Sequence, residues 1–181
     1  MKTSVRVLPT VFNCEPFMNT LTFKYLYADS TKLPFENAKD ASVWLKGIIT
    51  GCGKKLERVV SLLRSDPDNL KAIISDMLSD DEEKFNGKHI KVIEAKMSIM
   101  DEANPQRKML GDLTKDLVWI QSYLYPKDKF IESNFAAFKP SDCDKELLKE
   151  ASRSIALDMC NALLNSLERS RVEPEGISPS R

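Results

Sequence analysis

The stretch NPQRKMLGDLTKDLVWIQSYLYP, residues 104–126, decides the class of fold. Its apolar residues recur every three or four positions, which places them on one side of an α-helix. Asn104-Pro105 opens this helix and Pro126 terminates it. The buried stripe is predicted to contain Met109, Leu110, Leu113, Leu117, Ile120 and Leu124. A chain with such a helix at its centre is expected to be mainly α-helical.

A second long helix is predicted upstream, from Asp40 onward. Its apolar face contains Ala41, Leu45, Ile48, Cys52, Leu56, Val59 and Leu63. The weak point is the glycine trio Gly47, Gly51 and Gly53, because each glycine inside a helix costs about 1 kcal/mol relative to alanine. Either a packed partner lies against this stretch, or the helix breaks there.

Between these two helices, capping residues and a proline indicate where further helices begin. Asp66 is suited to cap a helix whose first position is Pro67. Ser79 and Glu82 fit a capping box for the next helix, with acidic residues at its positive end. The pair Asn86-Gly87 is expected to interrupt the chain, after which a helix is favoured over a strand. The apolar residues of these segments are Leu70, Ile73, Ile74, Met77 and Leu78, followed by Ile90, Ile93, Met97 and Met100.

Downstream, residues 127–140 are predicted to form a loop, which either packs back on the core or binds a partner. This loop is rich in apolar side chains, namely Phe130, Ile131, Phe135 and Phe138. Ser141 is expected to cap a final helix of about seven turns. The apolar face of that helix contains Leu148, Ala151, Ile155, Met159, Leu163 and Leu167.

The N-terminal segment has a different period. Leu21, Phe23, Tyr25 and Tyr27 alternate with other residues as in a β-strand, and the segment around Arg6 offers a short partner strand. The predicted class is therefore α+β but predominantly α: about five helices in a bundle with a small two-stranded β element. We divide the chain into a β element at 1–35, a helical bundle at 36–169 and a disordered tail at 170–181.

Composition narrows the classes of function. The 181 residues suit one domain, and 27 basic residues balance 27 acidic ones, so the whole molecule has no net field that attracts nucleic acid or anionic membranes. The four cysteines are widely spaced and the N-terminus lacks the apolar core of a signal peptide, so the thiols are expected to be reduced. No stretch is long enough to span a membrane. An intracellular location, cytoplasmic or nuclear, is expected.

No catalytic, metal or cofactor site is predicted. The segment IITGCGKK at 48–55 resembles a phosphate-binding loop, but that motif needs glycine in place of Ile48 and serine or threonine in place of Lys55. His89 is interpreted as a surface histidine, because no partner is suggested by spacing. Cys52 and Cys160 lie on apolar helix faces, and Cys143 is flanked by acidic residues that oppose a thiolate.

We therefore expect a non-catalytic module that binds another protein, or a second copy of itself, through apolar helical surfaces, as an adaptor, a regulatory factor or a subunit of an assembly. The candidate partner-binding residues are Phe130, Phe135, Phe138, Met97 and Met100. The alternative is a nucleic-acid-binding or nucleoprotein-associated factor that uses Lys54, Lys55 and Arg58, of which Lys54 and Arg58 would share a helix face. No small-molecule substrate is indicated.

Overall fold

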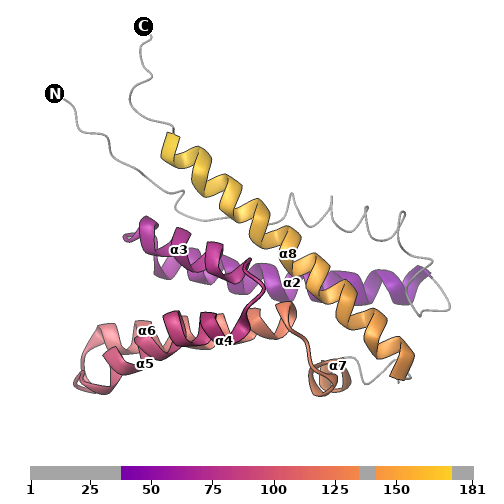
Figure 1. The fold of residues 1–181 in the computed structure, drawn as a ribbon, viewed down its shortest axis with the longest axis horizontal. Coiled ribbons are helices and arrows are strands. Elements are labelled where there is room, and N and C mark those ends of the chain that lie inside the picture. The colour runs from indigo at the N-terminus through magenta and orange to yellow at the C-terminus, as the bar shows by residue number, and fades with distance from the viewer. Residues whose placement is uncertain (1–37, 135–141, 173–181) are drawn as a thin grey trace, which may run out of the picture.

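The computed structural model describes residues 38–134 and 142–172, and all the regular structure in them is helical (Figure 1). The predicted predominance of helix is thus confirmed, whereas the two-stranded element predicted at 1–35 lies outside the described residues. The elements in chain order are α2 (Ala38–Leu62), α3 (Pro67–Met77), α4 (Glu82–Phe85), a π-helical turn (Asn86–Ile90), α5 (Lys91–Ser98), α6 (Pro105–Leu124), α7 (Asp128–Asn134) and α8 (Asp142–Val172).

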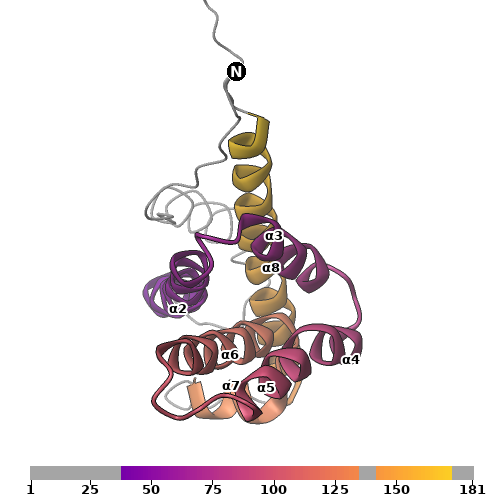
Figure 2. The same ribbon diagram turned by 90° about the vertical axis from the view of Figure 1, so that its left-hand side faces the viewer.

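Helix α6 lies at the centre of the packing, between α2 and α5 (Figures 1 and 2). Helix α8 crosses both α2 and α6, and α3 packs against α8. The predicted stripe of α6 faces inward, with Leu113, Leu117, Ile120 and Leu124 fully buried. The opposite side of α6 is left toward solvent. None of the helices in this part of the chain has the length and apolarity needed to cross a bilayer.

Helix α2 runs unbroken through its glycines, and a packed partner lies against Gly51. The ring of Tyr123 on α6 sits so close to Gly51 that a Cβ atom there would overlap the tyrosine hydroxyl and lie 3.1 Å from Cζ. Tyr123 is itself buried and packs edge-on against Phe130, with ring centroids 5.2 Å apart. Gly47, in contrast, faces open space. Of the two alternatives left open by the sequence, close helix packing is correct.

Pro67 and Pro105 begin their helices as predicted, but α4 begins at Glu82, later than a Ser79 cap would place it, and two of the predicted caps are wrong. Pro67 opens α3, yet the side chain of Asp66 accepts no capping hydrogen bond. At α4 the cap is Asp81, whose Oδ1 accepts a 2.9 Å bond from the Lys84 N–H, and not Ser79. The Ser79 hydroxyl donates instead to the Asp76 carbonyl at 2.6 Å. A carboxylate directly before the helix makes the stronger, charge-assisted bond at the positive helix end.

The predicted interruption at Asn86-Gly87 is also wrong, because the chain continues as a π-helical turn that joins α4 to α5. The wider turn keeps Phe85, His89 and Ile90 buried. His89 Nε2 lies 2.6 Å from Asp76 Oδ2 on α3, and the His89 ring packs at a tilt against Phe85, with ring centroids 5.0 Å apart. These tertiary contacts outweigh the local turn preference of Asn-Gly. A helix after this pair was predicted, and α5 confirms it.

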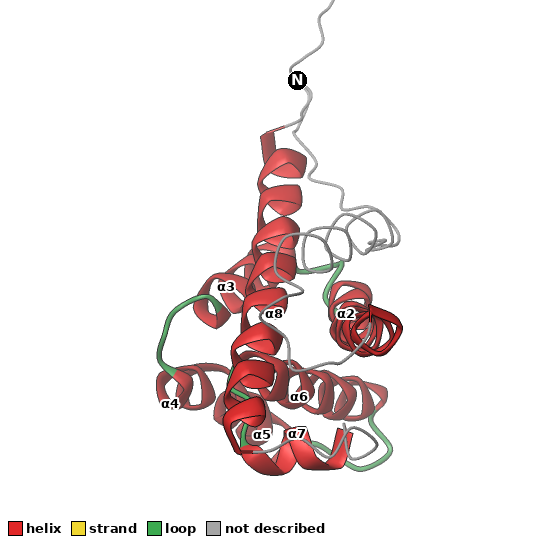
Figure 3. Ribbon diagram, turned by 90° about the vertical axis from the view of Figure 1, so that its right-hand side faces the viewer, coloured by secondary structure: helices red, strands yellow, loops and turns green. Residues whose placement is uncertain are grey.

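The last prediction to correct is the loop at 127–140, whose first half is helix α7 in the structure (Figure 3). Ile131 on α7 is fully buried, so this half of the segment packs back on the core, which was one of the two alternatives that the sequence left open. Phe135, Phe138 and Ser141 lie outside the described residues. The predicted face of α8 is confirmed, with Leu148, Ile155, Met159, Leu163 and Leu167 buried and Ala151 partly buried. The division into three segments stays a prediction.

Candidate functional site

Two large apolar side chains point outward from the middle of α6. Val118 is 46% exposed and Trp119 is 41% exposed, although their neighbours Leu117 and Ile120 are fully buried. The sequence analysis did not select either residue. The sequence could have identified them, because the helical repeat that places Leu117 and Ile120 inside places Val118 and Trp119 outside.

Trp119 is held in place from α2 by one of the basic residues proposed for nucleic-acid binding. Lys55 Nζ lies 5.7 Å from the centroid of the indole ring, a cation–π contact. Arg58, one turn further along α2, places Nε 3.2 Å from Asp116 Oδ2, also on α6. Lys54 is exposed. Two of the three predicted basic residues therefore interact with α6, and only Lys54 extends into solvent without such a contact.

Asp116 is an unusual residue in this position because its side chain is only 1% exposed. Neither carboxylate oxygen has a hydrogen-bond partner, and the contact with Arg58 is an ion pair without hydrogen-bond geometry. Burial raises the pKa of Asp116 more than the nearby Arg58 and Lys55 charges lower it. The carboxylate thus keeps Arg58 on the α6 side of α2 and neutralises it there.

A hollow of about 510 Å³ lies beside the N-terminal half of α6. Its apolar part is formed by Met97 and by Gly111, where a Cβ atom would come within 3.4 Å of the methionine Cε. Arg107 Nε donates a 3.1 Å hydrogen bond to the Met97 carbonyl, which fixes the end of α5 against α6. We call this the Met97 hollow. Met100, the second predicted methionine, is half-buried but does not line it.

The remaining walls of the Met97 hollow are charged. Three cations, from Arg107, Lys108 and Lys115, line it together with the carboxylates of Glu102 and Asp112. No ion pair joins any of these five side chains to another residue in the described part of the chain. The hollow therefore has more positive than negative charge, and its charges are directed to solvent.

A smaller hollow, of about 140 Å³, lies at the other end of α6. Its apolar walls are Val118 and Phe130, the latter one of the predicted partner-binding residues. Lys127 Nζ and Glu82 Oε1 form an ion pair at 3.3 Å across it. Small-molecule sites usually measure roughly 300–1,000 Å³, so this hollow suits a single side chain. We call it the Phe130 hollow.

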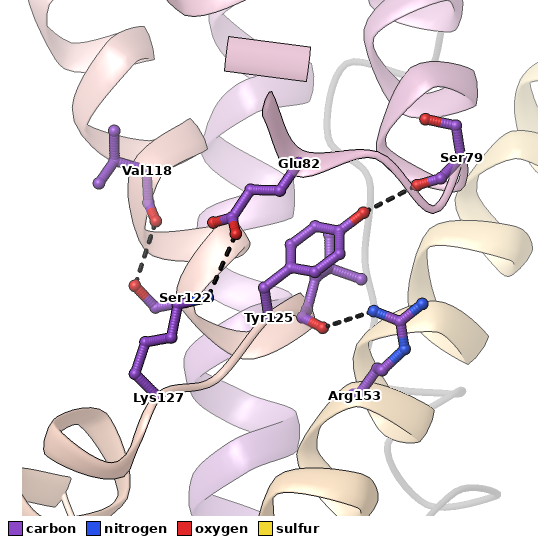
Figure 4. A network of polar contacts seen from close by, with 8 residues as sticks. Ser79, Glu82, Val118, Ser122, Tyr125, Lys127 and Arg153 are labelled. Atoms are coloured by element: carbon purple, nitrogen blue, oxygen red, sulfur yellow. Dashed lines mark hydrogen bonds and ion pairs between the residues drawn. The ribbon is translucent and has the colours of Figure 1, made fainter. Parts of the chain in front are cut away.

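Contacts beside the Phe130 hollow join the end of α6 to α8 and to the loop between α3 and α4 (Figure 4). The Tyr125 hydroxyl donates a 2.7 Å bond to the Ser79 carbonyl. Arg153 on α8 donates to the Leu124 carbonyl at 3.0 Å and to Asp80 at 2.7 Å, while its guanidinium lies 5.1 Å from the Tyr125 ring. A cation at the C-terminal carbonyls of α6 is favourable for the helix dipole. The hollow is therefore preformed.

Gln121 borders the same hollow, and its buried side-chain amide lacks a hydrogen-bond acceptor for its N–H groups in the described part of the chain. It is only 6% exposed, and its Nε2 has no hydrogen-bond partner among the described residues. A buried amide without a partner costs roughly 1–3 kcal/mol.

Titratable side chains are also buried elsewhere in the described residues. His89 was expected at the surface, but it is 8% exposed and bonded to Asp76, whose Oδ2 also lies 3.0 Å from Lys88 Nζ. This contact joins α3 to the π-helical turn. Cys52 and Cys160 are buried as expected, and burial raises the pKa of Cys160 to about 12. The side chain of Cys143 lies outside the described residues, and those that are described contain no cluster of potential metal ligands.

The two hollows and the exposed pair form one strip, which we call the α6 face. Lys115 lines the Met97 hollow and is one turn from Trp119, while Val118 lines the Phe130 hollow. The axial distance from Gly111 to Ser122 is about 16 Å at 1.5 Å per residue. No protein-family model, curated protein or solved structure matches this chain.

Proposed function

We propose that this chain is a non-catalytic protein-binding module that takes an amphipathic helix of another protein on its α6 face. The observation that supports this most directly is the exposure of Val118 and Trp119 between two hollows. Tryptophan is among the residues that contribute most binding energy at interfaces. An exposed tryptophan that is already oriented by Lys55 loses less side-chain entropy on binding than a free one.

The dimensions of the α6 face suit a helical partner. Residues about 11 positions apart on a partner helix are separated by roughly 16 Å and would reach both hollows, with intermediate positions over Val118 and Trp119. Met97 and Phe130, two of the residues expected from the sequence to bind a partner, line the two hollows. Methionine adapts its shape to different side chains, which suits it to a docking surface.

The test is a comparison of captured proteins between the natural chain and two variants. A Val118→Asp, Trp119→Ser variant removes the apolar centre of the α6 face. The control is Val43→Asp, which alters a residue that is 58% exposed on α2. Val43 precedes Lys55 by 12 positions, or about 18 Å along the helix. The Val43→Asp control is expected to keep its stability within about 0.5 kcal/mol, because that side chain is exposed. The α6-face variant also loses the cation–π contact with Lys55, which costs about 0.5–1 kcal/mol and leaves the chain folded.

We expect a protein that the natural chain and the Val43→Asp control retain equally, and that the α6-face variant retains at least tenfold less. A tenfold loss corresponds to about 1.4 kcal/mol of binding free energy. That is less than the roughly 1.5–3 kcal/mol obtained by burying one large apolar side chain completely. Equal retention by all three chains would contradict the proposal.

The second candidate, a nucleic-acid-binding factor, is favoured by one observation. Trp119 has basic neighbours in Lys55 and Lys115, and an aromatic ring among cations is the usual platform for stacking a base of a single strand. Lys55 already occupies a position over the indole ring, however, and Arg58 is neutralised by Asp116. The apolar Val118 and the Phe130 hollow have no role in that mode. A protein partner is therefore preferred.

A further inference from the structure

We infer that the helix bound on the α6 face presents an acidic residue to the Met97 hollow, and that this contact fixes the direction in which the helix docks. The inference rests on the proposed function and adds the chemistry of the partner. Its basis is the difference between the two ends of the face. The Met97 hollow contains three cations and two carboxylates, whereas at the Phe130 hollow Lys127 and Glu82 neutralise each other.

Two cations of the Met97 hollow stand at the end of α6 that is unfavourable for positive charge. Arg107 and Lys108 are the third and fourth residues of α6, and the first turn of this helix contains no acidic residue. The N-terminal end of a helix carries a partial positive charge, so two cations there are unfavourable for helix stability. A local rule broken in this way points to a role outside folding. A carboxylate from a partner would satisfy both the cations and the helix end.

The geometry of Arg107 also favours an external acceptor. Its Nε is used by the 3.1 Å bond to the Met97 carbonyl, which holds the guanidinium at the edge of the hollow. The terminal N–H groups make no ion pair with a described residue. Lys108 and Lys115 are seven positions apart, so they lie on the same side of α6 and border the hollow together. A single carboxylate that entered the hollow would have the charged groups of Arg107, Lys108 and Lys115 around it.

The partner is thus described by a pattern: a glutamate or aspartate for the Met97 hollow, apolar residues four and seven positions along for Trp119 and Val118, and an apolar residue about 11 positions along for the Phe130 hollow. A helix in the opposite direction would place its acidic residue beside Glu82 and Lys127. These two are already paired with each other. The reversed helix therefore gains less from its charge.

The test uses two synthetic 18-residue peptides that differ at one end only. Both carry leucine at the three apolar positions of the pattern; one has two glutamates at the end for the Met97 hollow, and the other has two lysines there. Binding is followed through the backbone amide signals of residues 105–124 and the indole N–H of Trp119 in ¹⁵N-labelled protein. The protein variants are Lys108→Glu with Lys115→Glu, and the control Lys84→Glu with Lys91→Glu, which makes the same change in net charge on exposed side chains outside both hollows.

We expect the glutamate peptide to bind the natural chain and the control about tenfold more tightly than the lysine peptide, and the preference to invert in the Lys108→Glu, Lys115→Glu variant. Equal binding of both peptides would overturn the inference and leave the proposed function standing. Binding of neither peptide would overturn both. Tighter binding of a 15-nucleotide oligothymidylate at the same amides would overturn both in favour of the nucleic-acid alternative.

Discussion

Replacing Gly51 by alanine is expected to destabilise the protein, although alanine is the better helix former. In an exposed helix interior the change from glycine to alanine gains about 1 kcal/mol. At Gly51 the new methyl group would overlap the Tyr123 hydroxyl and lie 3.1 Å from Cζ. The tyrosine ring is rigid and buried, and it rests edge-on against Phe130. It cannot give way without disturbing the core.

Overpacking of a filled core costs roughly 1–3 kcal/mol, so the net loss at Gly51 is expected to be about 1 kcal/mol and at most about 2. Gly47→Ala is the matched control in the same helix, because nothing lies within 4 Å of the added methyl group. It is expected to gain about 0.5–1 kcal/mol. For a chain of this length, 1 kcal/mol shifts Tm by roughly 2–4 °C.

Urea denaturation followed by circular dichroism measures both changes, and Tyr123→Phe completes a double-mutant cycle. Removing the hydroxyl should recover most of the loss in the Gly51→Ala chain. The reasoning is refuted if Gly51→Ala stabilises the protein as much as Gly47→Ala does, or if Tyr123→Phe gives no recovery. Either result would mean that α6 does not pack on the glycines of α2 as described.

Three further predictions concern buried polar groups. Burial raises the pKa of Asp116, so its ionised form costs stability above that pKa and the cost is relieved as pH falls through it. Arg58→Met alone should therefore lose about 1–3 kcal/mol at pH 7 in urea denaturation, while Arg58→Met with Asp116→Leu should be at least as stable as the natural chain; a double variant weaker than the single one would contradict this. Desolvation raises the pKa of Asp76, but the hydrogen bonds from His89 and Lys88 outweigh this effect, so that the pKa lies below its ordinary value of 3.8. Its contribution is present above 3.8 and lost as pH falls through the lowered pKa, so Asp76→Asn should cost about 1.5–3 kcal/mol at pH 7 in thermal melts and progressively less as acid protonates the carboxylate; a loss independent of pH would refute the assignment. Cys160, with its pKa raised to about 12, should resist alkylation by maleimide at pH 8 in a Cys14→Ser, Cys143→Ser chain until urea unfolds it, and rapid modification of the folded protein would show that the thiol is accessible.

The features that could be predicted from the sequence are those set by local periodicity. The inward stripe of α6 and the apolar face of α8 follow from spacing alone, and both are buried except at their partly exposed members Met109, Leu110 and Ala151. Pro67 and Pro105 mark helix starts because proline fits only the first turn. The same register placed Val118 and Trp119 on the outside. They can be identified as the apolar residues of the helix that do not belong to its buried stripe.

The features that could not be predicted depend on contacts between segments far apart in sequence. Local preference left the glycines of α2 undecided, because the residue that packs on Gly51 is Tyr123 on another helix. The Asn86-Gly87 pair has the composition of a turn, yet the bond between His89 and Asp76 keeps this segment helical. The two hollows are likewise formed only when the helices assemble.

The most direct test of the account is photo-crosslinking in cells from a benzophenone amino acid placed at Val118, with the same amino acid at the exposed Asn161 on α8 as the control. The account predicts that Val118 yields an adduct with a partner protein, that the site on the partner is a helical segment with an acidic residue about 11 positions from an apolar one, and that Asn161 yields no such adduct. An adduct formed at Asn161 but not at Val118 would contradict the assignment of the α6 face as the docking surface.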